Sequence, residues 1–280
     1  MLQQLPLQRT WNNLEPFRIT ILGCGSAIPT THHNPSSQIV TIRQKLFMVD
    51  CGEGTQLQVR RAKIRFTKVG QVFISHRHGD HCLGFTGMIS TFGMLGRTAP
   101  LHIYAPKDLI PILKVQQEFF CSEVGYDIVY HHVDTTKNDV IFEDKSLSIS
   151  TIPLFHRVPC CGYLFKEKPT PRRLEMGIPP KSYAYCSDTR YDPSIASVVK
   201  GVTVLYHEST YGDDRAEYAA TYMHSTAADA ARTALEAGAG KLILGHFSAR
   251  YEKNEEVLLE QAKNIFPNSV LANEYEVIDV

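Results

Sequence analysis

The sequence Val72-Phe73-Ile74-Ser75-His76-Arg77-His78-Gly79-Asp80-His81 joins a short apolar run to a dense group of potential metal ligands. The apolar run predicts a buried strand, and the polar residues predict the loop at its end. Side chains alternate along an extended segment, so His76 and His78 point to the same side. A tight turn at Gly79 directs Asp80 and His81 elsewhere, which suits a second metal. A solvated turn without function is the alternative, and so dense a group of histidines argues against it.

Three further residues of the same chemical kind each follow an apolar run: His156, Asp188 and His246. Each alone is more often a capped loop residue than a metal ligand. The four ligands of the first motif are too few to fill two metal sites. Together with these three residues they are enough, so the sequence predicts a centre of two metals. Imidazole and carboxylate donors suit Zn²⁺, and they also accept Mn²⁺ or Fe²⁺. Two such ions about 3.5–4 Å apart clamp a scissile phosphate, and a carboxylate such as Asp188 can bridge them.

The chain has 280 residues with 29 Lys and Arg against 29 Asp and Glu, so its formal net charge is zero. This balance excludes a strongly basic, histone-like nucleic-acid binder, but local basic clusters still allow an RNA substrate. The irregular spacing of the cysteines predicts buried thiols rather than disulfides. No apolar run of about 18 residues occurs, so no membrane span is predicted. Residues 1–17 lack the apolar core of a secretory signal, so we expect a cytoplasmic protein.

Hydrophobic patterning predicts strands that come first as hairpins and then alternate with helices. The predicted strands are Arg18–Leu22, Gln38–Ile42, Leu46–Val49, Val72–Ile74, Leu101–Tyr104, Asp127–His131, Ser146–Ile152, Tyr183–Tyr185, Thr203–Tyr206 and Lys241–Leu244. The predicted helices are Gly54–Arg61, Phe85–Leu95, Leu109–Phe120, Thr226–Ala237 and Glu255–Ile265. Mixed sheets with helices outside them are expected, the α/β class. No linker divides the chain, so residues 1–280 are predicted to form one domain with a surface excursion at 166–181.

The remaining motifs resemble the metallo-β-lactamase superfamily and, within it, the ribonuclease Z family of tRNA 3′-processing endonucleases. The resemblance runs in order from about Phe17 to the C-terminus. Beyond the first motif, it is carried by Ile21–Ala27 with Pro29, Asp50–Gln56, His156–Pro159 with Gly162-Tyr163, Ser187–Arg190, His207–Thr210, His224–Thr226 and Gly245–Tyr251. The last two segments are the most specific, since β-lactamases and glyoxalase-type hydrolases lack them.

This resemblance implies a four-layer αββα sandwich with two zinc ions at one edge of its sheets. It implies that one zinc is held by His76, His78, His156 and a bridging Asp188, and the other by Asp80, His81, Asp188 and His246. Asp80 would also orient the attacking water, and Glu208 with His224 would donate a proton to the leaving 3′-oxygen. The implied reaction is hydrolysis of the phosphodiester at the 3′ trailer of precursor tRNA, carried out by a homodimer.

Candidate substrate contacts are Ser248, Arg250 and Arg65. Arg65 belongs to a basic cluster before the metal motif, which suits RNA phosphates and a solvated loop equally well. The Pro-x-Lys-x-Arg-Asn string that reads the mature CCA end in many ribonuclease Z proteins is absent from this sequence. The larger departure is the short segment 166–181, where the family usually inserts a long arm that grips the tRNA elbow. Arg172 and Arg173 in this segment suit phosphate contacts or a plain surface loop.

Several functions compete on these observations. A zinc endoribonuclease acting on precursor tRNA leads. A small-molecule phosphodiesterase with the same metal centre is the alternative, and the shortened arm favours it. A non-catalytic RNA-binding subunit is opposed by the complete set of ligands, which a subunit without activity does not need. A thioesterase or lactonase is a more distant alternative.

Overall fold

The computed structural model describes residues 16–280, without the side chain of Arg172. Residues 1–15, which make up most of the segment in which no secretory signal is predicted, lie outside this range. The first sheet contains, in spatial order, β14 (Val277–Asp279), β1 (Phe17–Gly23), β2 (Ser37–Ile42), β3 (Lys45–Val49), β4 (Val69–Phe73), β5 (Leu101–Pro106) and β6 (Ile128–Val133). Strands β1 to β3 form an antiparallel meander, and β3 to β6 run parallel.

The second sheet combines the same two kinds of pairing. It contains, in spatial order, β13 (Ser269–Leu271), β12 (Lys241–Gly245), β11 (Val204–Glu208), β10 (Ser182–Cys186), β9 (Cys161–Glu167), β8 (Leu147–Pro153) and β7 (Val140–Glu143). Strands β7 to β10 pair antiparallel, and β10 to β13 run parallel. The predicted mixed sheets are therefore confirmed.

Helices connect many of the strands, and most of these helices cover the outer faces of the two sheets. They are α1 (Thr55–Arg61), α2 (Gly79–Cys82), α3 (Phe85–Met94), α4 (Ile110–Phe120), α5 (Pro171–Glu175), α6 (Pro193–Val198), α7 (Ala216–Tyr222), α8 (Ala227–Ala237) and α9 (Glu256–Lys263). The predicted start of α8 is confirmed, because Thr226 and Asp229 form a reciprocal capping box. Within residues 16–280, none of the helices has the length and apolar character needed to traverse a lipid bilayer.

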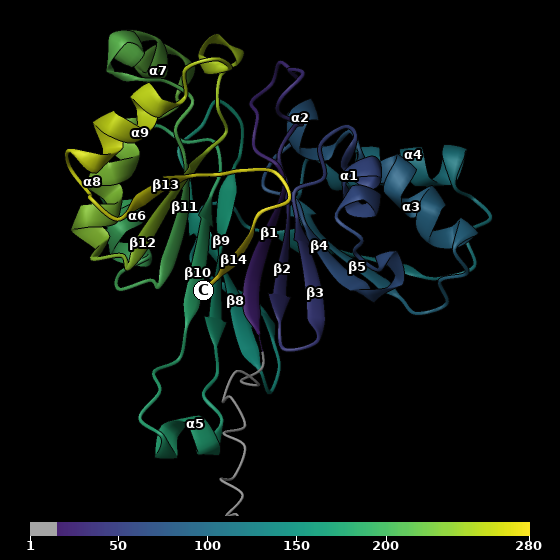
Figure 1. The fold of residues 1–280 in the computed structure, drawn as a ribbon. Helices are drawn as coiled ribbons and strands as arrows, with labels where there is room; N and C mark the ends of the chain where they lie inside the picture. Colours follow the sequence, from purple (N-terminus) through teal and green to yellow (C-terminus); the bar gives the residue numbers. More distant parts are fainter. Residues whose placement is uncertain (1–15) are drawn as a thin grey trace, which may run out of the picture.

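The four layers follow from strands that are apolar on both faces. In β3, Phe47 points to the core between the sheets and Met48 points to the core under the helices. In β4, Phe73 points to the core between the sheets and Val72 points to the core under the helices. Helices α1, α3 and α4 cover the first sheet, and α6, α8 and α9 cover the second (Figure 1). The predicted αββα sandwich is confirmed by this arrangement.

Every predicted strand and helix has a counterpart in the structure, and short or irregular elements were missed. Strands β13 and β14 have three residues each, and α2 and α5 have four and five, so none is long enough to show periodicity. The first five residues of β9 lack charged side chains and do not alternate with polar ones, a pattern that does not distinguish a strand from a buried helix. Strand β7 and helices α6 and α7 were also missed.

The surface excursion at 166–181 lies away from the predicted metal motif. It carries α5 between the end of β9 and the start of β10, at the opposite end of the molecule from α2 and α7 (Figure 1). Arg173 is buried there and forms an ion pair of 2.8 Å with Glu167. Arg173 therefore holds the excursion in place rather than facing solvent, and the Arg172 side chain lies outside the described part of the structure.

Candidate metal centre

The predicted ligands all follow strands that end at one edge of the two sheets. His76 and His78 lie between β4 and α2, and Asp80 and His81 lie in the first turn of α2. The others come from the second sheet: His156 follows β8, Asp188 follows β10 and His246 follows β12. The predicted turn at Gly79 is a short helix, and it carries Asp80 and His81 past the first two histidines.

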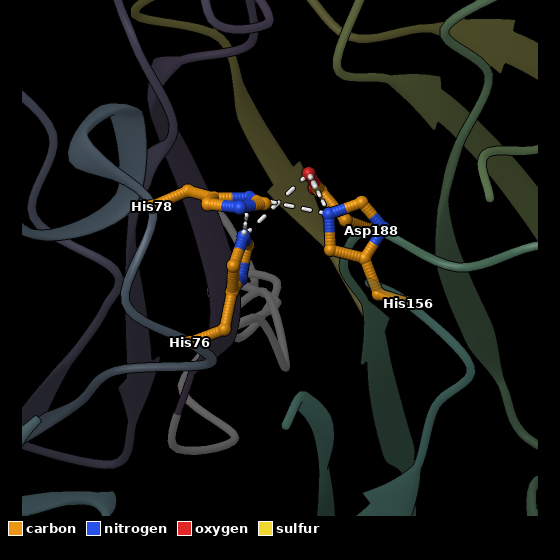
Figure 2. A group of neighbouring side chains, drawn as sticks. All are labelled: His76, His78, His156 and Asp188. Atoms are coloured by element: carbon orange, nitrogen blue, oxygen red, sulfur yellow. Dashed lines mark hydrogen bonds and ion pairs between the residues drawn. The ribbon is translucent and has the colours of Figure 1, made fainter. Parts of the chain in front are cut away.

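One group of donor atoms belongs to His76, His78, His156 and Asp188 (Figure 2). His78 Nδ1 lies 3.1 Å from His76 Nε2 and 3.2 Å from His156 Nε2. Asp188 Oδ2 lies 3.6 Å from His76 Nε2 and 3.7 Å from His156 Nε2. Residues from both sheets therefore point at one common position.

A second group belongs to Asp80, His81, Asp188 and His246. Asp188 Oδ1 lies 3.2 Å from the Nε2 atoms of both His81 and His246. Asp80 Oδ2 lies 3.3 Å from the same two nitrogens, which are 3.3 Å apart. Asp188 thus faces one group with each of its oxygens, as the predicted bridging role requires.

The spacing of the donor atoms fits tetrahedral zinc. Zn–N and Zn–O bonds of about 2.0–2.1 Å place the ligand atoms of a tetrahedron roughly 3.3–3.4 Å apart. The donor pairs quoted above span 3.1 to 3.7 Å in the first group and 3.2 to 3.3 Å in the second. Both groups are therefore shaped to hold a metal ion with little rearrangement.

Hydrogen bonds hold the histidine rings from behind. The bonds join His76 Nδ1 to Ser75 Oγ at 3.0 Å, His81 Nδ1 to Asp50 Oδ2 at 2.7 Å, His156 Nδ1 to Met223 O at 3.0 Å and His246 Nδ1 to Thr210 Oγ1 at 2.8 Å. A carbonyl or carboxylate oxygen only accepts, so His81 and His156 donate from Nδ1. Each ring is thereby held with its Nε2 toward its donor group, and the His81 ring would release its second proton when a metal binds.

Asp50 is a functional residue to which sequence reasoning assigned no role. Its buried carboxylate accepts hydrogen bonds from His81 Nδ1, the Tyr185 hydroxyl and both the backbone and the hydroxyl of Ser75. Its φ is 54°, a left-handed conformation that Asp and Asn adopt more readily than most residues. The signal in the sequence was its place directly after an apolar strand, as for His156 and Asp188.

Asp50→Asn should lower the affinity of the second donor group for metal by about 10- to 100-fold, because His81 loses its charged partner. Zinc titration followed by isothermal calorimetry should show one weakened site and one retained site. The asparagine keeps the size of the side chain and tolerates the left-handed backbone, so a folding defect is not expected. Two sites of unchanged affinity would contradict the role given to Asp50.

Burial and neighbouring charges set the protonation of the ligands. Burial lowers the pKa of His76 well below its ordinary value, so its ring is neutral as a metal ligand must be. Burial opposes ionisation of Asp80, but the charge of His81 and hydrogen bonds from His246 and His81 hold its pKa below the usual range. Burial also opposes ionisation of Asp188, but the neighbouring His246 and His81 hold its pKa well below the ordinary value.

Glu208 and His224 form a pair beside the second donor group. Glu208 Oε1 accepts a hydrogen bond of 2.8 Å from His224 Nδ1 and one of 2.9 Å from the backbone of Thr189. Its other oxygen accepts from the backbone and hydroxyl of Thr210. Burial alone would lower the pKa of His224, but the charge and hydrogen bond of Glu208 outweigh it and raise the pKa to about 9. The His224 ring is therefore protonated at neutral pH.

A cleft of about 420 Å³ opens over both donor groups. His78, Asp80, Asp188, His224 and His246 line it, and so do the predicted substrate contacts Ser248 and Arg250. Arg65 is not brought to this cleft. It lies before the start of β4, whereas the metal motif follows the end of that strand, and it lines a separate hollow with Arg60 and Lys63. A contact between Arg65 and RNA stays a prediction.

A third cluster is made of Cys24, His33 and Glu274, and Cys24 lies two residues before Ser26, which lines the cleft. His33 Nδ1 is 3.3 Å from Cys24 Sγ, and His33 Nε2 is 2.6 Å from Glu255 Oε1. Burial would lower the pKa of His33, but the hydrogen bond and charge of Glu255, together with Glu274, raise it above its ordinary value. The carboxylates around His33 therefore favour its protonated form.

This arrangement predicts a pH-dependent contribution to stability. A histidine whose pKa is raised on folding stabilises the protein fully below its unfolded pKa of about 6.5, and the contribution is lost as pH rises through the folded pKa. The difference in free energy of unfolding between the wild type and His33→Gln should therefore be larger at pH 6 than at pH 9 in urea titrations. Glu255→Gln removes the partner and should flatten this dependence, whereas an equal difference at both pH values would contradict the prediction.

Comparisons with known proteins identify the family of the chain. A family model described as "Anti-Pycsar protein Apyc1" matches residues 17–263. Ribonuclease Z of Bacteroides fragilis is 45% identical over 299 aligned positions, covering 93% of this chain and 98% of the relative. Ribonuclease Z of Bacteroides thetaiotaomicron is 44% identical over 305 positions, covering 95% and 96%. Both alignments are longer than this chain of 280 residues, so both relatives carry residues that have no counterpart here.

Solved structures show the same fold. The short form of human tRNase Z, ELAC1, superposes with a TM-score of 0.78 at 25% identity, covering 93% of this chain and 98% of that one. YhfI of Bacillus subtilis, a metallo-β-lactamase fold protein, superposes with a TM-score of 0.76 at 21% identity, covering 95% and 100%. The sandwich and its convergent donors define a metal-binding hydrolase of the metallo-β-lactamase superfamily. With 44–45% identity to curated members over almost its whole length, the chain belongs to the ribonuclease Z family.

Proposed function

We propose that this chain is an endoribonuclease with two metal ions that hydrolyses precursor tRNA at its 3′ trailer. The observation that carries the proposal is the sharing of Asp188 by two complete donor groups, with the Glu208–His224 pair beside them in one cleft. The identity to ribonuclease Z proteins supports RNA as the substrate. The short form of human tRNase Z, with the same fold, supports tRNA as the RNA concerned.

The residues take the following parts in this proposal. His76, His78 and His156 hold one ion, Asp80, His81 and His246 hold the other, and Asp188 bridges them. Zinc is the proposed metal, because the donors are imidazole and carboxylate at tetrahedral spacing. Bound metal ions would place positive charge beside the phosphoryl oxygens and lower the pKa of the attacking water.

The protein supplies orientation and proton transfer. The carboxylate of Asp80 faces the cleft and accepts a hydrogen bond from the water that attacks the phosphorus. His224 is held protonated by Glu208 and donates its proton to the 3′-oxygen that leaves the phosphorus. Among the described residues, His224 Nε2 has no hydrogen-bond partner, so this nitrogen is free to make that donation.

A homodimer is part of the proposal, and its interface would lie on α3 and α4. Exposed apolar side chains gather on these helices: Met94, Ile112, Val115, Phe119 and Phe120. Several large apolar side chains exposed on two neighbouring helices are typical of an interaction site. We further propose that residues 1–280 act as one domain in the cytoplasm.

The function is tested by cleavage of a precursor tRNA with a 3′ trailer, in the presence of zinc or manganese, beside bis(p-nitrophenyl) phosphate. A cut after the discriminator base or after CCA supports the proposal. Hydrolysis of the small diester without cleavage of the tRNA would overturn it in favour of a small-molecule phosphodiesterase. The short excursion at 166–181 and the extra residues of the relatives are what favour this second function.

A further inference from the structure

One side of the cleft is lined by aromatic and cationic side chains that have no part in metal binding. Tyr211, Tyr218 and Tyr222 lie on this side together with Arg157 and Arg250. Tyr218 and Tyr222 are four residues apart on α7, so they project from the same face of this helix. Helix α7 stands beyond the ends of β11 and β12, at the same end of the molecule as α2 (Figure 1).

The aromatic rings form a continuous series that leads to the catalytic pair. Ring centroids are 6.2 Å apart between Tyr222 and Tyr218, 6.4 Å between Tyr218 and Tyr211, and 6.1 Å between Tyr211 and His224. Tyr218 and Tyr222 remain 40% and 41% exposed. A tyrosine that serves the core buries its ring, so these two rings keep surface available for a ligand.

Two arginine side chains lie beside these tyrosine rings and bring positive charge to them. The guanidinium of Arg157 lies 5.5 Å from the ring centre of Tyr222, and that of Arg250 lies 5.9 Å from the ring centre of Tyr218. Both arginines are exposed, and within residues 16–280 neither forms an ion pair with a carboxylate. Aromatic faces beside unpaired cations are the combination that proteins use for single-stranded nucleic acid, since bases stack and phosphates pair.

We propose that Tyr218 and Tyr222, framed by Arg157 and Arg250, form a stacking site for an unpaired nucleotide next to the scissile phosphate of RNA. This inference rests on the proposed function. It adds which part of the substrate is recognised by these four residues, which we call the rim. A nucleotide on this site would reach the centre from the side of His224, because Tyr211 joins the rim to that residue. The nucleotide on this side carries the leaving 3′-oxygen, so the site would hold the last base of the mature tRNA, and because stacking does not distinguish bases it would tolerate different bases there.

The test compares the double variant Tyr218→Ala/Tyr222→Ala with the wild type on two substrates. We expect kcat/KM for precursor tRNA, divided by kcat/KM for bis(p-nitrophenyl) phosphate, to fall by about 10- to 100-fold. Tyr218→Phe/Tyr222→Phe should restore the ratio, because a phenyl ring also stacks. Tyr191→Ala is the matched control: Tyr191 contacts Arg232 through a similar ring contact of 5.0 Å and does not line the cleft.

A precursor tRNA that lacks a single base tests which base stacks on Tyr218 and Tyr222. A precursor tRNA with an abasic nucleotide on the 5′ side of the scissile phosphate should lose the same factor with the wild type and little more with the double variant, whereas an abasic nucleotide on the 3′ side should have a smaller effect. Equal losses on tRNA and on the small diester would show a structural role for the tyrosines and overturn the proposal. An unchanged ratio in the double variant would overturn it as well. A wild type that does not cleave precursor tRNA would instead refute the proposed function, so the two failures are distinguishable.

Discussion

Asp188→Asn should remove metal from both halves of the centre and lower kcat for precursor tRNA by on the order of 10³-fold or more. The two oxygens of Asp188 face different donor groups, with Oδ1 at 3.2 Å from His81 Nε2 and Oδ2 at 3.6 Å from His76 Nε2. The amide replaces one oxygen by a group that only donates hydrogen bonds. It also removes a negative charge from among several imidazoles, so the metal affinity of both groups should fall.

Zinc per chain, measured by mass spectrometry after desalting, and single-turnover cleavage would test this expectation. Asp192→Asn makes the same chemical change four residues further on. Asp192 caps α6 by accepting a hydrogen bond of 3.0 Å from the backbone of Ser194, and asparagine caps helices as well as aspartate does. The control should therefore keep its metal and its rate. Two tightly bound zinc ions per chain in Asp188→Asn would contradict the bridging role.

His224→Ala should leave the metal content at the wild-type level and lower kcat for precursor tRNA by about 10²- to 10⁴-fold. The leaving 3′-oxygen is a strong base and needs a proton as its bond to phosphorus breaks. In the proposed mechanism His224 gives this proton, because Glu208 fixes its ring by a hydrogen bond of 2.8 Å and raises its pKa to about 9. Glu208→Gln keeps the size of the partner without its charge, so its loss should be smaller.

The nature of the leaving group separates proton donation from a structural effect. p-Nitrophenolate departs without a proton, so the loss in His224→Ala should be far smaller on bis(p-nitrophenyl) phosphate than on RNA. Rates on both substrates, with zinc content measured on the same preparation, make the comparison. Parallel losses on the two substrates would refute the assignment of His224 as the proton donor.

Much of the metal centre is visible in the sequence because its ligands are local. His76, His78, Asp80 and His81 lie within six residues at the end of one strand, and that density alone indicates a metal. His156, Asp188 and His246 were predicted from polar residues at strand ends, and the structure brings all of them to the same edge. Their roles as ligands stay predictions that the variants above would test.

Other features depend on contacts that local patterns do not contain. Asp50 is separated from His81 by 31 positions, and its role exists only because the adjacent strands β3 and β4 run parallel. Arg65 is near the metal motif in sequence, yet the length of β4 places it at the other end of the sheet from the cleft. Arg173 has the charge of a phosphate ligand, and burial against Glu167 gives it a structural part instead.

The sequence was sufficient for the layers of the fold and for the chemical type of the centre. Strands that are apolar on both faces must lie between other layers, and a dense set of imidazole and carboxylate donors must bind metal or remain exposed to water. The division of the donors into two groups was implied by the family resemblance, whereas the tertiary structure alone gave the distances within each group, the oxygen of Asp188 that faces each group and the tyrosines that border the cleft. These are distances between segments far apart in the chain, and they are set by how two sheets pack rather than by any local pattern of residues.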